Sequence, residues 1–361
     1  MITCLNCNAP YPATGTPYRC PTCGGLYDYA DLPAFDSAQI DAAQPGIWRY
    51  RHTFGLPETA QPVSLGEGST PLLWDEAFGL RIAFKCEMAN PSGAYKDRGM
   101  AVLFGFLRAR GVQAALEDSS GNAGAAFAAY AARAGIAATV LVPASASGPK
   151  RRQIEAYGAT LLPMEGTRTQ VAEAARARAD SGMVYGSHAY MPFVLTGYAT
   201  LAYELYEQMG GAPGSVLLPA GQGGLLLGLA RGFEMLRRAG LIARVPPLYG
   251  VQAEACAPLW ALFTYGRAGL QWVSENPTVA EGVRVRYPLR GDAVLRAVAA
   301  SNGKMLVVRE ERILPARDQL ARRGLYVEPT SALVWDALEQ LQGSMLQPVA
   351  VVLTGTGLKS N

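Results

Sequence analysis

Short apolar runs alternate with longer amphipathic segments along most of this chain, and this alternation is its strongest constraint on the fold. Three amphipathic segments predict helices that end near glycine, at 124–135, 169–182 and 224–240. The alternation predicts open parallel sheets, and the number of strand–helix units predicts two α/β domains with a cleft between them. The apolar runs predict buried strands at 114–117, 138–143, 159–164, 215–220, 248–253, 305–308 and 349–355.

Composition narrows the class of protein. Half of the 361 residues are hydrophobic and 17% are charged, which is enough apolar material for a large core. The net charge of +3 is too small to favour nucleic acid or an anionic membrane as a partner. Neither a signal peptide nor a long apolar span is evident, so we expect a soluble cytoplasmic protein. Having only two histidines, His52 and His188, argues against a histidine-rich metal centre or a serine–histidine triad.

Four of the six cysteines lie at the N-terminus, as two C-x2-C pairs separated by twelve residues. Four thiolates with this spacing are typical of a structural zinc site, which predicts a zinc ribbon over residues 1–30. Disulfides are disfavoured in a chain without an export signal. The predicted ligands are Cys4, Cys7, Cys20 and Cys23. The isolated Cys86 and Cys256 are expected to be buried packing residues, and residues 31–63 to form a connector with one short helix.

The stretch "NPSGAYKDRGM", residues 90–100, places Lys96 directly after a group of turn-forming residues. Taken alone, Lys96 would be an ordinary solvated lysine at a helix start. Its position in a loop beside a predicted sheet makes it a candidate for chemistry, because a lysine amine can form an imine with an aldehyde.

A second loop follows the strand at 114–117 and opens the helix after it with "SSGN", Ser119 to Asn122. Backbone N–H groups at such a helix start favour an anion, for example a carboxylate. The Asn122 amide could contact a ring hydroxyl. The alternative is a simple helix cap formed by Ser120 or Asn122.

Two further loops complete the candidate site. "PAGQGGLLLGL", residues 219–229, is a glycine-rich turn whose N–H groups could bind a phosphate, although it lacks the dinucleotide and P-loop patterns. Thr354 follows the last predicted strand, where its hydroxyl is either a ligand contact or a polar cap. A lysine, a phosphate-binding turn, an amide and a hydroxyl together match the needs of pyridoxal phosphate.

These motifs make the chain resemble the fold-type II pyridoxal-phosphate enzymes, and most closely the threonine synthases. The resemblance spans nearly the whole chain, and a zinc ribbon also occurs in family members. It implies that residues 64–361 are the catalytic region, that 97–195 form a smaller mobile domain, and that the protein is a homodimer. The matching stretches are "LGEGSTPL", "KCEMANPSGAYKDRGM", "SSGNAGAAFAAYAARAG", "GLYVEPTSA" and "LTGTGLKS".

The resemblance also implies residue roles. Lys96 would be the Schiff-base lysine and would move the proton at the substrate Cα. Asn122 would hydrogen-bond the pyridine 3'-oxygen, and Thr354 would contact the ring nitrogen. The cofactor phosphate would be bound by Gly221, Gln222, Gly223, Gly224 and Leu225. The carboxylate of an amino-acid substrate would be bound by Ser119, Ser120, Gly121, Asn122 and Ala123.

The chain departs from the threonine synthases where they bind the substrate phosphate. The positions of their serine, arginine and glutamate are here Ala189, Val194 and Thr196. The glycine loop is closer to those of threonine and serine ammonia-lyases. Three hypotheses remain: a threonine synthase that binds its phosphorylated substrate differently, an ammonia-lyase or O-phosphoserine-using β-replacement synthase, and a non-catalytic adaptor on a degenerate enzyme scaffold. In the first, other cations such as Lys150, Arg151 and Arg152 would bind the phosphate, although a solvated helix start is the favoured interpretation of these three.

Overall fold

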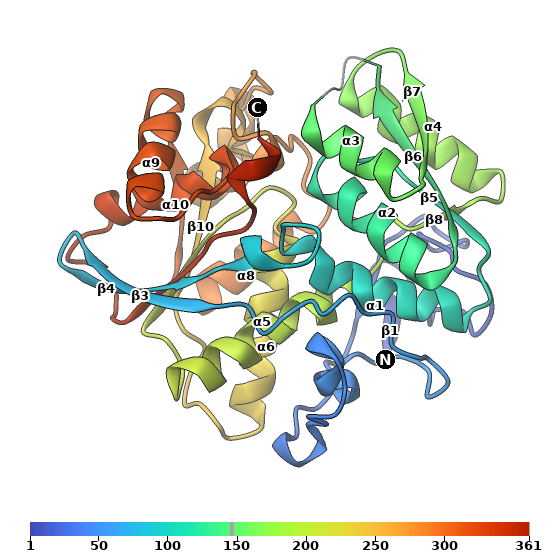
Figure 1. Ribbon diagram of the computed structural model, residues 1–361, viewed down its shortest axis with the longest axis horizontal. Coiled ribbons are helices and arrows are strands. Elements are labelled where there is room, and N and C mark those ends of the chain that lie inside the picture. Colours follow the sequence, from blue (N-terminus) through green and yellow to red (C-terminus); the bar gives the residue numbers. More distant parts are fainter. Residues whose placement is uncertain (145–147, 361) are drawn as a thin grey trace. The chain divides into compact units, whose positions relative to one another are not determined.

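The computed structural model describes residues 1–144 and 148–360, which form two compact units (Figure 1). The first unit consists of Met1–Gly68 and Lys96–Gly197, and the second of Ser69–Tyr95 and Tyr198–Ser360. Each contains a largely or wholly parallel sheet, which confirms the predicted α/β class. The mobility of a domain over 97–195 stays a prediction. Within the described ranges, no helix combines the length and apolar content needed to cross a membrane.

The sheet of the first unit has the strand order β7–β6–β5–β8, with all neighbours parallel. The chain moves outward from β5 to β6 to β7 and then returns, so that β8 lies on the other side of β5. Helices α2 and α3 cover one face and α4 the other (Figure 1). The bounds are β5 Ala114–Glu117, α2 Asn122–Ala134, β6 Ala137–Pro143, α3 Pro149–Ala156, β7 Thr160–Met164, α4 Arg168–Asp180 and β8 Val184–Tyr185.

The six-stranded sheet of the second unit has the order β11–β10–β9–β12–β4–β3. The chain again moves outward, from β9 to β11, and returns to place β12 on the other side of β9. Only β3, at one edge, is antiparallel to its neighbour, and the short β3–β4 hairpin was not anticipated from the sequence. The bounds are β3 Leu72–Ala77, β4 Leu80–Lys85, β9 Ser215–Pro219, β10 Leu248–Ala253, β11 Lys304–Val308 and β12 Val349–Val352.

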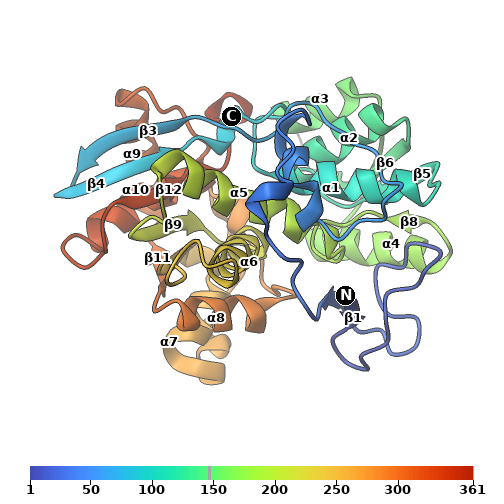
Figure 2. The same ribbon diagram turned by 90° about the horizontal axis from the view of Figure 1, so that it is seen from below.

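Helices cover both faces of this second sheet, as expected for buried parallel strands. On one face α9 and α10 pack over Leu217, Val251 and Val351, and on the other α6 and α8 lie against β10 (Figure 2). Gly250 of β10 allows this close approach, because a Cβ there would lie 2.9 Å from the side chain of Leu226 in α6. The bounds are α6 Gly224–Arg238, α7 Pro258–Tyr265, α8 Gly291–Ala300, α9 Glu310–Arg322 and α10 Pro329–Gln340, and α5, Phe193–Met209, runs from the first unit into the second.

The N-terminal segment belongs to the first unit. Strands β1, Ile2–Cys4, and β2, Tyr27–Tyr29, form an antiparallel pair. The predicted connector contains two 3-10 helices rather than one, at Ser37–Gln39 and Gly46–Thr53. Trp48 in the second of these is fully buried against Gly105 of α1, Lys96–Ala109. A Cβ on Gly105 would lie 2.5 Å from the Trp48 ring, so glycine is required for this packing.

A buried ion pair stabilises the second unit. Lys85, the last residue of β4, is fully buried and its Nζ donates to Glu204 Oε2 at 2.8 Å. The same ammonium donates to Gln208 Oε1 and to the carbonyl of Thr70. Glu204 in turn accepts a hydrogen bond from the backbone N–H of Ser69. Three acceptors around one ammonium offset the cost of removing both charges from water.

Replacing Lys85 by methionine should lower the free energy of unfolding by about 3–5 kcal/mol, because Glu204 would be left buried without its cation. Denaturant unfolding followed by circular dichroism measures this loss. The matched control is Arg237→Ala, which breaks a partly exposed pair with Glu234 and should cost at most about 1 kcal/mol. Equal losses in the two variants would contradict the stabilising role of the buried pair.

Candidate functional site

In both sheets the strand order reverses at one point, and the predicted ligand-binding loops lie at these two reversals, whereas Lys96 follows β4 and starts α1. Such reversals, at the carboxyl ends of parallel strands, are where open α/β sheets bind ligands. In the first unit the reversal lies between β5 and β8, and the loop after β5 contains the Ser119–Asn122 motif. In the second unit it lies between β9 and β12, which are followed by the glycine loop and by Thr354.

Lys96 and Asn122 both stand at helix starts of the first unit. Lys96 is the first residue of α1 and Asn122 the first of α2, and both side chains are half-buried. The cap residue of α2 is Gly121, and no side chain of the described residues caps that helix, so capping by Ser120 or Asn122 is wrong. The turn packs tightly onto α2, since a Cβ on Gly124 would lie 1.8 Å from the Ser119 carbonyl oxygen. The N–H groups of this turn remain suited to an anion.

The glycine loop of the second unit has the shape of an anion-binding turn. Gly223 precedes α6 with φ of +75°, a left-handed conformation that glycine adopts without strain. A Cβ on Gly221 would lie 2.6 Å from the Gly282 carbonyl oxygen. The Gln222 side chain accepts a hydrogen bond from the Leu289 N–H, which holds the loop in place. Among the described residues no side chain caps α6, so its first N–H groups and its dipole suit a phosphate.

Thr354 lies just beyond β12 and is buried. Its backbone is held on both sides, because its N–H donates to Ser331 Oγ at 2.9 Å and its carbonyl accepts from the Tyr95 N–H. Its hydroxyl oxygen, by contrast, has no hydrogen-bond partner among the described residues. A buried hydroxyl without a partner is costly, and a ring atom of a bound ligand would satisfy it.

The reversal in the first unit also holds a pair of titratable residues that the motifs did not include. Glu117 ends β5, and His188 follows Gly186 and Ser187 after β8. The His188 Nδ1 lies 2.8 Å from Glu117 Oε1. Glu117 is fully buried and the His188 side chain is 14% exposed. The sequence offered two signals for this pair: Glu117 is a carboxylic acid at the end of a predicted strand, and His188 is one of only two histidines.

The charges of this pair are set by burial and by its neighbours. Burial raises the pKa of Glu117 well above its ordinary value, as does Asp118, against the opposing charges of Arg168 and Lys96. Burial lowers the pKa of His188 well below its ordinary value, and the charges of Lys96 and Arg168 act in the same direction. The lysine predicted to do chemistry is therefore electrostatically coupled to both members of the pair.

Next to the pair, Asp118 ties three elements of the first unit together. Its carboxylate lies 2.6 Å from Arg168 Nη1 of α4 and accepts a hydrogen bond of 2.7 Å from the Tyr185 hydroxyl at the end of β8. Burial and the nearby charge of Asp118 raise the pKa of Tyr185 well above its ordinary value. Asp118 thus fixes the end of β8 next to the end of β5.

The positions where threonine synthases hold the substrate phosphate contain no cation here. Val194 is fully buried in α5, and Thr196 donates its hydroxyl to the Phe193 carbonyl oxygen at 3.0 Å. The basic trio at 150–152 lies in the first turn of α3, where Arg151 pairs with Glu155 along the helix at 3.6 Å. This helix-surface pair agrees with the interpretation of the trio as a helix start.

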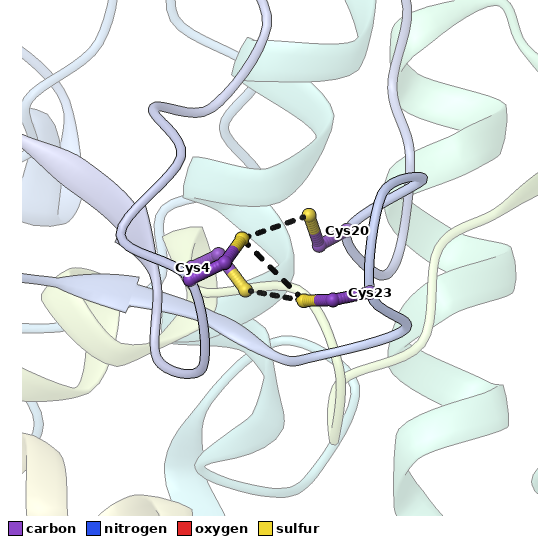
Figure 3. Close-up of side chains that lie close together, drawn as sticks. Cys4, Cys20 and Cys23 are labelled. Atoms are coloured by element: carbon purple, nitrogen blue, oxygen red, sulfur yellow. Dashed lines mark hydrogen bonds between the residues drawn. The ribbon is translucent and has the colours of Figure 1, made fainter.

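The four N-terminal cysteines converge within the first unit, with all four sulfur atoms within 4.8 Å of one another (Figure 3). Cys4 and Cys23 are 3.4 Å apart, and Cys7 and Cys20 3.7 Å. Four sulfurs at about 2.3 Å from one zinc ion in a tetrahedron would be about 3.8 Å apart. The cluster therefore has the size of a four-sulfur metal site.

The two C-x2-C pairs adopt the same tight turn. The N–H of Asn8 donates to the Cys4 carbonyl, and that of Gly24 to the Cys20 carbonyl. Both residues have positive φ, 59° at Asn8 and 72° at Gly24. Although burial raises the pKa of Cys20, N–H donors of Cys23 and Thr22 outweigh it and lower the pKa to about 6. The N–H groups of the turns thus favour the thiolate form of Cys20, whereas the pKa of Cys23 is raised to about 12: the Gly25 N–H lowers it, but hydrogen bonds with Cys4 and Cys7 outweigh this.

The other two cysteines are buried, as predicted. Burial raises the pKa of the Cys86 thiol to about 11 and also raises that of Cys256. Both therefore remain thiols near neutral pH and contribute packing.

Most of the chain is similar to known proteins that belong to one family of enzymes. Residues 63–355 match the family described as "Pyridoxal-phosphate dependent enzyme". The threonine synthase of Methanocaldococcus jannaschii is 30% identical over 99% of this chain and 92% of its own length. That of Mycobacterium leprae is 35% identical over 87% and 89%. The crystal structure of a threonine deaminase from T.th. matches with a TM-score of 0.65 and 29% identity, covering 80% of this chain and 92% of that one.

A fungal L-serine ammonia-lyase from Rhizomucor miehei shares the fold, with a TM-score of 0.70 at 20% identity over 83% of this chain and 96% of that one.

The buried neutral histidine predicts how stability depends on pH. An unfolded histidine binds a proton below its ordinary pKa of 6.5, whereas burial and the charges of Lys96 and Arg168 lower the pKa of His188 well below that value in the folded protein. The unfolded state then holds more protons, so His188 lowers the free energy of unfolding by up to about 1.4 kcal/mol per pH unit as the pH falls. His188→Gln removes this effect, and its stability relative to the unmodified protein should rise between pH 6.5 and 5.5.

Urea unfolding of both proteins at these two pH values measures the change. His52→Gln is the control, because His52 is less buried and Asp36 opposes the lowering of its pKa, so a smaller rise is expected. No pH-dependent difference for His188→Gln would show that His188 is protonated to the same extent in the folded and unfolded states.

Proposed function

Because the chain belongs to the pyridoxal-phosphate-dependent enzymes, and within them to the threonine synthase family, we propose that it converts O-phospho-L-homoserine and water into L-threonine and phosphate. One observation carries this proposal: the match to the M. jannaschii threonine synthase extends over 99% of the chain, which leaves no large region without a counterpart.

The residues at the two strand-order reversals fit the proposed cofactor. The turn at Gly221 and Gly223 has no room for Cβ atoms and opens α6, as a phosphate site requires. The buried Thr354 hydroxyl suits the ring nitrogen. We propose that Gly221, Gln222, Gly223, Gly224 and Leu225 bind the cofactor phosphate, that Thr354 contacts the ring nitrogen, and that Asn122 contacts the ring 3'-oxygen.

When bound, pyridoxal phosphate supplies an electron sink that lowers the energy needed to remove a proton from the substrate Cα. Lys96 would bind the cofactor covalently at rest and, when displaced by substrate, take and return that proton. Residues 119–123 would bind the substrate carboxylate through the N–H groups at the start of α2. This fixes the amino-acid end of the substrate and leaves its side chain for other groups.

One observation favours a second candidate function. Threonine synthases place a cation where this chain has the buried Val194, and a phosphate dianion needs charge-assisted partners. A threonine or serine ammonia-lyase needs no such partner. The similarity to a threonine deaminase at 29% identity supports this alternative. Assembly as a homodimer stays a prediction from the family resemblance.

Incubation with O-phospho-L-homoserine should release phosphate and form threonine in equal amounts. Lys96→Ala should reduce the rate at least about 100-fold, because the group that moves the Cα proton is lost. Borohydride reduction followed by peptide mapping should place the cofactor on Lys96. The control Lys304→Ala removes an exposed lysine of β11 and should keep full activity. A 2-oxo acid formed from threonine or serine, without threonine formation from the phosphorylated substrate, would support the second function.

We further propose that Cys4, Cys7, Cys20 and Cys23 bind one structural zinc ion. All four positions of a tetrahedral site would be occupied by sulfur, which leaves none for substrate. Elemental analysis should find about one zinc per chain, and the double variant with Cys7→Ser and Cys23→Ser should lose it. Cys256→Ala, outside the cluster, should retain it. Full zinc content in the double variant would refute the assignment.

A further inference from the structure

The Glu117–His188 pair lies at the strand-order reversal of the first sheet, a position at which open α/β sheets bind ligands. Both residues lie at the carboxyl end of the first sheet, on the two strands that flank the strand-order reversal. Glu117 directly precedes the loop proposed to bind the substrate carboxylate. His188 comes from a segment 71 residues away in sequence. The electrostatic influence of Lys96 on both side chains places the pair near the amine proposed to act at Cα.

The pKa of each member of the pair is shifted toward its uncharged form. Burial favours a protonated Glu117 and an uncharged His188. The charged and titratable groups around the pair are Lys96 of α1, Asp118 next to Glu117, Arg168 of α4 and Tyr185 of β8. The Asp118 carboxylate accepts hydrogen bonds from both Arg168 and Tyr185. In the form in which both groups are uncharged, the Glu117 hydroxyl donates to Nδ1 of His188 and the imidazole hydrogen resides on Nε2.

A purely structural role explains this arrangement poorly. Burying a carboxyl group and an imidazole costs free energy, whereas burying apolar side chains at the same positions would not. The second oxygen of Glu117, Oε2, has no hydrogen-bond partner among the described residues. In the Lys85–Glu204 pair, by contrast, the Lys85 amine donates to three acceptors. Strongly shifted titratable groups in a ligand-binding position are typical of proton-transfer sites.

We propose that His188 is a catalytic acid–base residue for the substrate side chain, while Lys96 serves Cα, and that Glu117 is the positioning residue that supplies and takes back the proton of His188. This inference rests on the proposed function for the identity of the substrate. His188 would then be a second group, besides Lys96, that carries protons in the site, and Glu117 would restore its charge after each transfer.

The protons balance for O-phospho-L-homoserine. The bond from Cγ to the phosphate oxygen breaks and its electron pair leaves with the phosphate, while the proton lost from Cβ ends on the released hydrogen phosphate. His188 gives its Nε2 proton to Cγ, and the Glu117 proton moves to Nδ1. Water then bonds to Cβ and gives a proton to Nε2, and the Nδ1 proton returns to Glu117. The proton that Lys96 removed returns to Cα.

The same pair suits the second candidate function. A hydroxyl group is a poor leaving group unless it receives a proton, and the Nε2–H of His188 could supply one.

The first test needs no substrate. With only two histidines, ¹⁵N-histidine labelling of the holoenzyme gives two imidazole spin systems, and His52→Gln identifies them. His188 should remain neutral with its hydrogen on Nε2 from about pH 5.5 to 8. An imidazole that becomes protonated near its ordinary pKa, or that carries its hydrogen on Nδ1, would overturn the proposal. This result stands even if the proposed substrate is wrong.

The second test separates proton transfer from positioning. His188→Gln and Glu117→Gln should reduce threonine formation by a factor of about 10² to 10⁴. Exchange of the Cα hydrogen of L-threonine in D2O, which depends on Lys96, should change by no more than about threefold. His52→Gln should leave both rates unchanged. Unaltered turnover in His188→Gln would refute the proposal, as would an equal fall of turnover and exchange, which would indicate that His188 only positions Lys96 or the substrate.

Circular dichroism and cofactor absorbance confirm that each variant is folded and loaded. If neither variant folds, the labelling experiment on the unmodified holoenzyme decides the proposal alone. If the unmodified enzyme forms no threonine from O-phospho-L-homoserine, the proposed function fails while the protonation state of His188 still supports or overturns the pair.

Discussion

The order of the strands in the two parallel sheets is the constraint on which the rest of the structure depends. Parallel strands need crossover connections, and right-handed crossovers carry the chain outward on one face of a sheet. When the chain returns to the other side of the first strand, the loops after two neighbouring strands lead to opposite faces. In this protein the loops at the two reversals follow β5, β8, β9 and β12. They contain the Ser119–Asn122 motif, His188, the glycine turn and Thr354, respectively.

The two buried pairs, Lys85–Glu204 and Glu117–His188, differ in how completely their polar atoms are hydrogen-bonded. Lys85 and Glu204 form a salt bridge of 2.8 Å, and hydrogen bonds to Gln208, the Thr70 carbonyl and the Ser69 N–H surround it. Such a complete network stabilises a loop and leaves no capacity for chemistry. Glu117 and His188 share one hydrogen bond and lie next to Asp118, which raises the pKa of Glu117 further. A pair with one proton to move and little to stabilise either charged form is suited to proton transfer.

The cysteine segment contributes to the same region through packing within the first unit. The Tyr18 ring, close to Cys20 in sequence, makes edge contacts with Tyr185 and Tyr190, which flank His188. The Tyr18 hydroxyl also donates to Asp180 at the end of α4. The turns that bring the four sulfurs together therefore also place an aromatic side chain behind the end of β8. This gives the cysteine segment a structural connection to the first reversal.

The sequence alone was sufficient to predict the α/β class, seven of the strands, the three helices at 124–135, 169–182 and 224–240, and the convergence of the four cysteines. These features depend on local patterns: hydrophobic runs, helix periodicity, glycine at helix ends, and two C-x2-C turns. The family resemblance added roles for Lys96, Asn122 and Thr354, which stay predictions. The antiparallel β3–β4 hairpin was missed, because a short edge hairpin carries no strand–helix alternation.

The three-dimensional fold was needed to establish which strands are neighbours and, through them, that Glu117 and His188 form a pair. A pairing across 71 residues leaves no periodic pattern in the sequence. The shifts in the pKa of both members follow from burial and from the positions of Lys96, Asp118 and Arg168, which come from different elements. Local sequence determines what each loop contains, whereas the order of the strands determines which loops meet.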